Sequence, residues 1–220
     1  MIRLVASRVT TLILLIAVSA CSPKLDFHTF RQQQPKSILV LPPVNTTNSV
    51  RASEIYLASI ANPLGEAGYY VFPPLATFKY FIDQGIPSGS EAREIPTKKL
   101  QEIFGADAAL YSSIEQWGQK YSVIASEHRV SIRLSLVDLK SNHEIWSGVA
   151  SAVDQNRGGN SLAEMLVGAL IHSLSNNNPW TELSLARQAS MSAILDRNTG
   201  LLLGQRSPNS GEDLRGKEIK

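Results

Sequence analysis

The sequence of 220 residues contains a single cysteine, Cys21. One cysteine cannot close a disulfide within the chain, and it cannot supply the several thiolates of a cysteine-based metal site. A chemically modified Cys21 would also leave no free thiol for thiolate catalysis. The fold must therefore be stabilised by packing alone.

The chain also lacks a large net charge. It has 21 lysine and arginine residues against 19 aspartate and glutamate residues. Arg3 and Arg8 account for the difference, so the chain without its amino-terminal segment is neutral. A general phosphate-backbone binder needs a basic face that releases counterions. The composition thus argues against a nucleic-acid partner.

The apolar run at the amino terminus, Val9–Val18, is too short for a membrane-spanning helix. Such a helix needs about 20 apolar residues to cross a hydrocarbon core of about 30 Å. Arginines before the run and the small residues Ser19 and Ala20 after it are typical of a secretory signal peptide. A buried amino-terminal core helix is the alternative interpretation.

The residues Val18-Ser19-Ala20-Cys21 resemble the lipobox of bacterial lipoproteins. The resemblance implies a signal peptide over residues 1–20, cleavage between Ala20 and Cys21, a diacylglyceryl thioether on Cys21 and an acyl group on the new amino terminus. Each buried methylene of an acyl chain contributes about 0.8 kcal/mol, so several chains on one residue anchor a protein permanently. The sequence therefore predicts that the lipid on Cys21 attaches this protein to a membrane.

Sequence patterns for catalysis, metal binding or a cofactor are absent. The four histidines, none of which shares metal-ligand spacing with another, are His28, His128, His143 and His172. Ser88 lies outside any Gly-x-Ser-x-Gly pattern and indicates a loop. Gly158-Gly159 lacks the Gly-Lys-Ser/Thr end of a phosphate loop and indicates a hinge. We expect no catalytic residue, no metal site and no cofactor.

Two further sets of residues could carry function. Asp107, Asp138 and Glu144 could form paired carboxylates, but nothing in the sequence brings two of them onto one face, so capping and turns are the simpler interpretation. Tryptophan is enriched at interface hot spots, which singles out the three tryptophans: Trp117, Trp146 and Trp180. For Trp146 we favour a place in the core.

The first half of the chain indicates alternating strands and helices. Residues 21–36 are rich in proline and glutamine and indicate a tether. The expected elements that follow are strand 37–41, helix 52–67, strand 69–72, helix 74–84, helix 96–104 and strand 108–114. Strand 37–41 is continuously apolar, as in a strand covered on both faces. This order is typical of a largely parallel sheet.

The second half changes period. Val130, Ile132, Leu134 and Leu136 alternate with polar residues, which predicts an antiparallel strand with one wet face. A polar turn at 140–143 and a strand at 144–153 complete a hairpin. Helices are expected at about 161–175 and 183–195, and a flexible tail over 206–220. The predicted fold class is α/β, with a partly parallel sheet from a β-α-β-α-β half, an antiparallel hairpin and carboxyl-terminal helices, forming a single domain over 37–205.

The helix expected at 161–175 is apolar over much of its circumference. Its main stripe, spaced at three and four residues, includes Leu162, Met165, Leu166 and Leu170, and Val167 and Ile171 add a second apolar edge. Such a stripe is usually core, but a helix that is apolar on two sides must bury both. These six residues are therefore a candidate interface for self-association or for a partner.

Several phrases together resemble one family of bacterial lipoproteins of unknown function, which includes a meningococcal surface antigen. They are Lys36–Pro43, Gly65–Pro73, Ile103–Ala108 and Arg206–Pro208, and the resemblance extends from the lipobox to about Pro208. It implies a fold similar to the amino-terminal domain of TolB and no catalytic residue. It also suggests homodimers and association with other envelope lipoproteins. Ser22 after the lipidated cysteine, rather than aspartate, implies sorting to the outer membrane.

Three functions stay open. The first is a non-enzymatic, outer-membrane-anchored lipoprotein whose periplasm-facing domain is a protein-interaction module, as a homodimer in an envelope assembly. The second is a periplasmic binding domain for a cell-wall glycan or small ligand. The third is an envelope hydrolase. An exposed apolar patch would favour the first, an open aromatic-lined cleft the second, and a cluster of histidines or carboxylates in a pocket the third.

Overall fold

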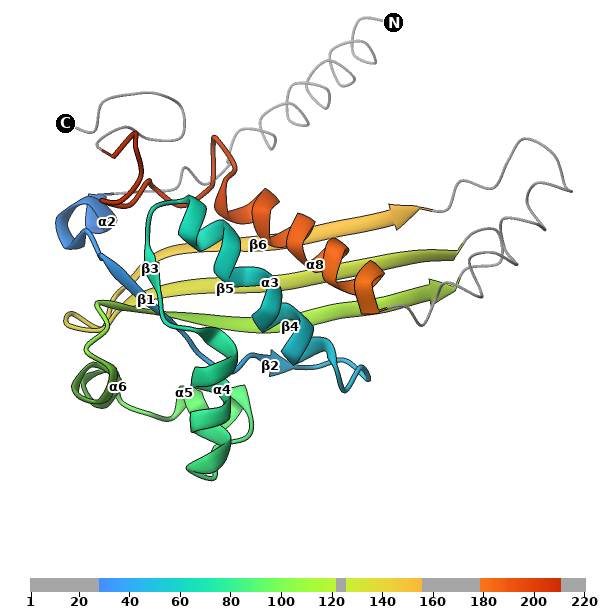
Figure 1. Cartoon of the computed structure of the whole chain (residues 1–220), viewed down its shortest axis with the longest axis horizontal. Coiled ribbons are helices and arrows are strands. Elements are labelled where there is room, and N and C mark those ends of the chain that lie inside the picture. Colours follow the sequence, from blue (N-terminus) through green and yellow to red (C-terminus); the bar gives the residue numbers. More distant parts are fainter. Residues whose placement is uncertain (1–27, 122–125, 156–178, 211–220) are drawn as a thin grey trace, which may run out of the picture.

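The computed structural model describes residues 28–121, 126–155 and 179–210 (Figure 1). In chain order, the elements are α2 (His28–Gln33), β1 (Ser37–Val40), β2 (Val44–Asn45), α3 (Ala52–Glu66), β3 (Tyr70–Val71), α4 (Pro74–Asp83), α5 (Gly89–Arg93), α6 (Thr97–Phe104), β4 (Ala108–Tyr121), β5 (Ser126–Asp138), β6 (Glu144–Gln155) and α8 (Pro179–Ile194).

One sheet organises the molecule, with the strand order β3-β1-β4-β5-β6 and with β2 also paired to β4. β1 runs parallel to both β3 and β4. β4, β5 and β6 form a long antiparallel meander. The predicted fold class is thus confirmed: the strand-helix half builds the parallel part, and a hairpin and a carboxyl-terminal helix follow.

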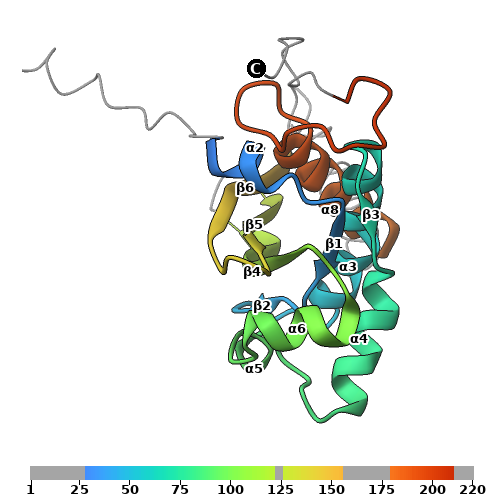
Figure 2. The same cartoon turned by 90° about the vertical axis from the view of Figure 1, so that its left-hand side faces the viewer.

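β1 is buried on both faces, as its continuous apolar run predicts. Ile38 and Val40 contribute to a core beneath α3 and α8, whereas Leu39 and Leu41 contribute to a second core. That second core includes Phe81 of α4 and further side chains from α6 and β4. Figure 2 shows α3 and α8 together on one side of β4, β5 and β6. The parallel strands therefore lie between two helical layers.

β5 has the single wet face that its alternation predicts. Val130, Ile132, Leu134 and Leu136 are all at most 1% exposed, whereas Arg133, between two of them, is exposed. The apolar side faces the core that α3 and α8 cover. The polar residues that alternate with these four, Arg129, Ser131, Arg133 and Ser135, thus lie on the other face of the sheet.

The structure adds a helix inside the segment predicted to be a tether. α2 spans His28–Gln33, and its Phe30 is only 4% exposed because it packs in the core beneath α3. Packing thus begins well before Ser37. A six-residue helix contains too few turns to show a periodic apolar pattern, so sequence patterns do not reveal it.

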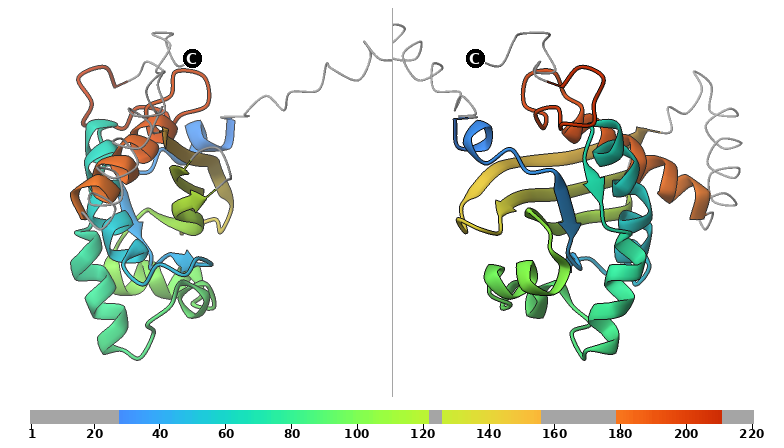
Figure 3. Two further views of the ribbon diagram at one scale, coloured as in Figure 1. Left: turned by 90° about the vertical axis from the view of Figure 1, so that its right-hand side faces the viewer. Right: turned by 60° about the vertical axis from the view of Figure 1, so that its left-hand side comes forward.

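The segment after α8 returns to α2 (Figure 3). Gly204 N–H donates to the carbonyl of Ala67 at 2.7 Å, and Arg206 N–H donates to the carbonyl of Gly68 at 3.2 Å. The Arg206 guanidinium lies 5.2 Å from the centre of the Tyr70 ring. The start of the segment predicted to be a flexible tail is therefore packed, although 37–205 as a domain and 206–220 as a tail stay predictions.

Candidate functional site

α4 has two apolar stripes, and only one of them faces a core. Phe81 is 2% exposed and belongs to the second core, with Pro74 and Thr77 buried on the same stripe. Leu75 and Ile82 lie on the other stripe and are 48% and 45% exposed. A helix with apolar side chains toward solvent has a surface that another molecule can cover.

This outer stripe forms one wall of a groove of about 620 Å³. The groove is lined by residues of three helices: Glu54, Ile55 and Ala58 of α3, Leu75, Phe78, Lys79 and Ile82 of α4, and Trp180 and Leu183 of α8. We call these nine residues the helix groove. The spacing of three and four residues in each helix places them on one face. Trp180 is 74% exposed, so a large aromatic side chain stands at the edge of the groove.

The charged residues of the helix groove are Glu54 and Lys79. The Lys79 ammonium lies 2.9 Å from a carboxylate oxygen of Asp83, one turn further along α4. Both partners of this pair are more than half exposed, so it adds little to stability. An apolar centre with a charged rim is the usual composition of a protein-binding patch.

A second, smaller hollow of about 250 Å³ lies between α2 and the segment after α8. Phe30, Arg31, Tyr69 and Leu202 are among its lining residues. The Tyr69 hydroxyl donates to the carbonyl of Leu202, and burial raises the pKa of Tyr69. A neutral tyrosine that is already hydrogen-bonded closes this end of the core and is not poised for proton transfer.

The three tryptophans have three different environments. Trp146 is 2% exposed, as predicted for a core residue, and its Nε1–H donates to the carbonyl of Thr199 at 2.9 Å. Trp117 is half-buried and donates to Oε2 of Glu182 at 3.3 Å. Trp180 is the one that lines the helix groove. The sequence singled out all three and could not rank Trp117 against Trp180.

Of the three carboxylates, Asp138 has the turn role that we favoured, whereas Asp107 and Glu144 bond to other strands or segments of the sheet. Oδ2 of Asp107 accepts from the backbone N–H groups of Lys36 and Ser37. Oδ1 of Asp138 accepts from the N–H and hydroxyl of Ser141, both at 2.6 Å, within the turn that follows β5. Glu144 accepts from the Ser135 hydroxyl across the β5–β6 pair at 2.5 Å.

Ser88 was predicted to lie in a loop, but it is the N-cap of α5. Its hydroxyl accepts from the N–H of Glu91, and the Glu91 carboxylate accepts from the N–H of Ser88, which together form a capping box. Ser88 thus has a structural role. Among the residues that the structure describes, no group of three or more His, Cys, Asp or Glu side chains could hold a metal ion.

Several predicted site residues lie outside the described residues. They are the lipidation and cleavage positions Ala20 and Cys21, and the candidate interface Leu162, Met165, Leu166, Val167, Leu170 and Ile171. Gly158, Gly159 and His172 also lie there. Within the described ranges, no helix is long and apolar enough to cross a membrane.

The chain matches a known protein family over nearly its whole length. The family model described as "Putative lipoprotein GNA1162-like" matches residues 25–206. A lipoprotein of Neisseria meningitidis serogroup B (strain MC58), named "Putative lipoprotein NMB1124/NMB1162", is 34% identical over 197 residues, which cover 87% of this chain and 92% of the relative.

The chain belongs to the GNA1162-like lipoprotein family.

A crystal structure supports the same assignment. Lipoprotein GNA1162 from Neisseria meningitidis is 38% identical, with a TM-score of 0.52, and the match covers 65% of this chain and all of that one. The resemblance predicted from the sequence is thus confirmed for the family, whereas the likeness to TolB stays a prediction. The names of these relatives state a lipoprotein and no enzymatic activity.

Sequence reasoning missed the helix groove, although a signal for it was present. In α4, Pro74, Thr77 and Phe81 share one face, and Leu75, Phe78 and Ile82 share the next. This is the same argument from two apolar faces that singled out residues 161–175. Residues of α3 and α8 complete the groove, and the sequence alone does not bring them beside α4.

Proposed function

We propose that this GNA1162-like lipoprotein is anchored in the bacterial outer membrane through lipid on Cys21. Its domain then serves as a non-enzymatic protein-interaction module that faces the periplasm. The observation that supports the protein-interaction role is the helix groove, a continuous apolar surface formed by α3, α4 and α8. Exposed apolar patches with a polar rim are typical of protein-interaction sites.

The occupant that fits best is a second copy of this chain. Most closed homodimers have two-fold symmetry, so the same patch on each copy must complement itself. The helix groove meets this requirement because its rim carries one carboxylate, on Glu54, and one ammonium group, on Lys79. In the two-fold dimer that we propose, Lys79 of each copy pairs with Glu54 of the other. Trp180 would then be covered by the facing copy.

The residues Leu162–Ile171 extend this proposal to a second surface. They were predicted as an interface from the sequence, and they precede α8, which carries Trp180 and Leu183 of the groove. An interface that continues from the groove into this segment would bury both apolar faces of the predicted helix.

A glycan or small ligand fits the helix groove less well. Sugar hydroxyls need several hydrogen-bonding partners, and the groove offers charged side chains only from Glu54 and Lys79. Four of its other residues, Ile55, Leu75, Ile82 and Leu183, are branched aliphatic residues. Such a lining favours an apolar protein surface.

The test is the mass of the full-length protein, purified from membranes in detergent, for the wild type and two matched variants. Ile82→Glu places a charge in the helix groove, at a side chain that is 45% exposed. The control, Ile103→Glu, places a charge outside the groove, on α6, at a side chain that is 53% exposed. Both positions are exposed enough for the fold to tolerate glutamate. We expect a dimeric wild type, a dimeric Ile103→Glu and a monomeric Ile82→Glu, with unchanged circular dichroism.

Two results would contradict this proposal. A wild type that is monomeric at all concentrations would rule out a second copy as the occupant. A dimer that Ile82→Glu leaves intact would place the interface elsewhere. Trp180→Ala is a further check, because loss of an exposed tryptophan that the facing copy covers should weaken a true groove interface by about 2 kcal/mol or more.

A further inference from the structure

The described part of the chain begins close to the proposed lipid anchor. His28, the first residue of α2, follows Cys21 by seven positions. A fully extended chain spans at most about 3.6 Å per residue, so α2 lies within about 25 Å of the anchored residue. Because Phe30 of α2 is buried in the core, this limit applies to the folded domain itself.

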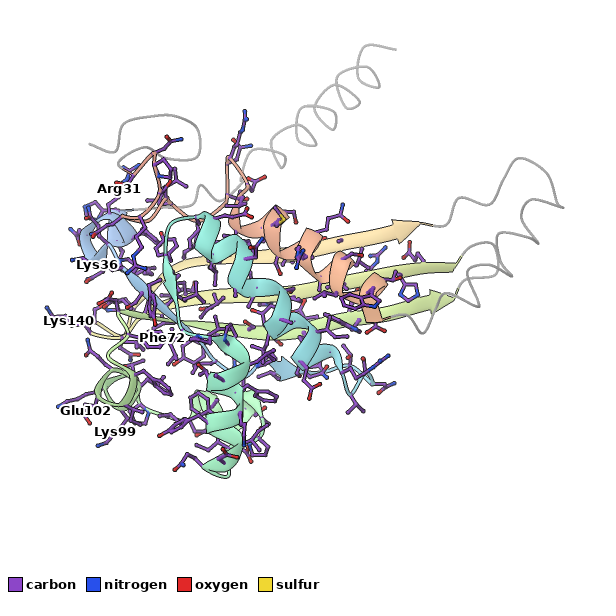
Figure 4. All side chains as sticks on the ribbon, in the orientation of Figure 1. Arg31, Lys36, Phe72, Lys99, Glu102 and Lys140 are labelled. Atoms are coloured by element: carbon purple, nitrogen blue, oxygen red, sulfur yellow. The ribbon has the colours of Figure 1, made fainter. Side chains whose placement is uncertain are left out.

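Two further segments share this end of the domain with α2. The N–H of Lys36 donates to the carboxylate of Asp107 at 2.9 Å, and the carbonyl of Asp107 accepts from the N–H of Leu139 at the same distance. Lys140 follows Leu139 in the β5–β6 turn. Figure 4 shows Arg31, Lys36 and Lys140 at the same end of the molecule. We call these three residues the α2 pole.

The cations of the α2 pole have no acidic partner in the described part of the chain. Within those residues, no ion pair involves Arg31, Lys36 or Lys140. The neighbouring carboxylates have other partners. Asp107 accepts hydrogen bonds from the start of β1, and Asp138 accepts them from its own turn. Glu102, labelled near this end in Figure 4, pairs with Lys99 at 3.0 Å.

The helix groove lies away from this end. The carboxyl end of α3 lies near α2. The carbonyl of Ala67, just after α3, accepts from the N–H of Gly204, and Gly204 lines the small hollow together with Phe30 of α2. The groove uses Glu54 and Ile55, near the other end of α3. The twelve residues from Ile55 to Ala67 correspond to about 18 Å of helix. A membrane at the α2 pole would thus leave the groove accessible.

We propose that the α2 pole rests on the membrane surface and that Arg31, Lys36 and Lys140 contact the phosphate groups of anionic phospholipids. The partner is the headgroup layer in which Cys21 is anchored, so this inference rests on the proposed lipidation. Cations are attracted to the surface of an anionic bilayer, so three of them at one end favour this orientation of a domain that the lipid already holds. The helix groove would then stay accessible to a second copy that is anchored beside this one in the same membrane.

The test uses full-length lipoprotein in vesicles of phosphatidylethanolamine and phosphatidylglycerol, with one added cysteine for a fluorescent label. His143→Cys places the label in the β5–β6 turn, beside the α2 pole, and Ala76→Cys places it on α4. Both positions are exposed. Lipids with a spin-labelled headgroup quench a nearby fluorophore. We expect strong quenching at position 143 and little at position 76.

A charge reversal provides the second measurement. Lys36→Glu combined with Lys140→Glu should reduce quenching at position 143, whereas Arg51→Glu, an exposed cation at the start of α3, should leave it unchanged. Mass spectrometry of the same samples reports the lipid on Cys21. A protein without lipid would overturn both the anchor and this orientation. Lipidated protein with equal quenching at positions 143 and 76 would overturn the orientation alone.

Discussion

Ser37 and Asp107 bond to each other in both directions. The Ser37 hydroxyl donates to Oδ2 of Asp107 at 2.9 Å, and the Asp107 backbone N–H donates to the same hydroxyl oxygen at 3.0 Å. Ser37 begins β1, and Asp107 immediately precedes β4. The pair therefore helps to fix the parallel register in which Ile38 lies opposite Ala108.

Asp107→Ala should lower the free energy of unfolding by about 2–3 kcal/mol, measured by urea denaturation of a soluble form that starts at Ser22. The carboxylate accepts three hydrogen bonds, from Lys36 N–H and from the N–H and hydroxyl of Ser37. Bonds to a charged group contribute about 1.5–3 kcal/mol each when buried, and these are partly exposed. Glu102→Ala, which removes an exposed ion pair, should change stability by less than about 1 kcal/mol. Equal effects of the two substitutions would contradict this role of Asp107.

Gly68→Ala and Gly65→Ala should have opposite effects on thermal stability. Gly68 has a φ of +92°, and a Cβ added there would overlap the backbone nitrogen of Ser207. We expect a loss of at least about 2 kcal/mol from strain and from this clash. Gly65 lies in α3, and a Cβ added there would meet no atom within 4 Å, so alanine should add about 0.5–1 kcal/mol. A stable Gly68→Ala protein would show that the segment after α8 does not pack against β3.

Stability should fall above about pH 10 because of two buried tyrosines. Burial raises the pKa of Tyr56 and Tyr69 above their ordinary value of 10.0, and the 2.5 Å hydrogen bond between Tyr56 and Ser112 only partly offsets this for Tyr56. Above pH 10, the unfolded chain loses phenolic protons that the native state retains. The unfolding free energy therefore decreases with pH, by up to about 1.4 kcal/mol per unit for each tyrosine, and this contribution is fully present below pH 10.

Urea denaturation at several pH values between 8 and 11.5 (about the range in which tyrosine titrates) would measure this decrease. Tyr56→Phe should reduce the slope by the contribution of one tyrosine, although it also removes the partner of the Ser112 hydroxyl and so lowers stability at every pH. A slope that Tyr56→Phe does not change would refute the assignment.

Cys21→Ala should abolish labelling by a fatty-acid analogue and leave an unprocessed precursor. The reason is that the thioether forms on the cysteine sulfur, and cleavage before residue 21 depends on that modification in lipoproteins of this kind. Labelling of cells followed by gel electrophoresis measures both effects. Labelling that persists in this variant would show that Cys21 is not the lipid attachment site.

Ser22→Asp should increase the share of the protein in the inner membrane. Ser22 permits export to the outer membrane by the resemblance to sorted lipoproteins, and aspartate at this position opposes it. Fractionation of the two membranes on a density gradient measures the distribution. An unchanged profile would mean that residue 22 does not determine the destination of this lipoprotein.

Much of the fold could be predicted from local patterns. The run Ser37–Leu41 indicated a strand buried on both faces, and the alternation from Val130 to Leu136 indicated one wet face. Both were confirmed. The helix expected at 96–104 ends at Phe104 as predicted, and Gly105 is the C-cap of α6, with a φ of +68°. These predictions were correct because the pattern of a strand and the end of a helix depend on residues that are close together in the chain.

Other elements were not predicted, either because residues distant in the sequence stabilise them or because they are very short. β4 was expected to end at Ile114, but it continues to Tyr121 along β5, with an irregular register between Ile114 and Gln116. The polar residues that follow Ile114 form a strand only because β5 supplies hydrogen-bonding partners. α5 has the capping signal Ser-x-x-Glu at Ser88–Glu91, yet a five-residue helix shows no periodic pattern.

The sequence alone determined the single cysteine in its lipobox-like context, the family and the alternation of strands and helices, since each of these is written in residues close together in the chain. The tertiary structure decided where the helix groove lies. The sequence of α4 contains two apolar stripes, but only the packing of Phe81 against β1 and α6 shows that Leu75 and Ile82 remain at the surface. Periodicity reports how many faces of a helix are apolar, and the elements that pack beside it determine which of those faces are covered.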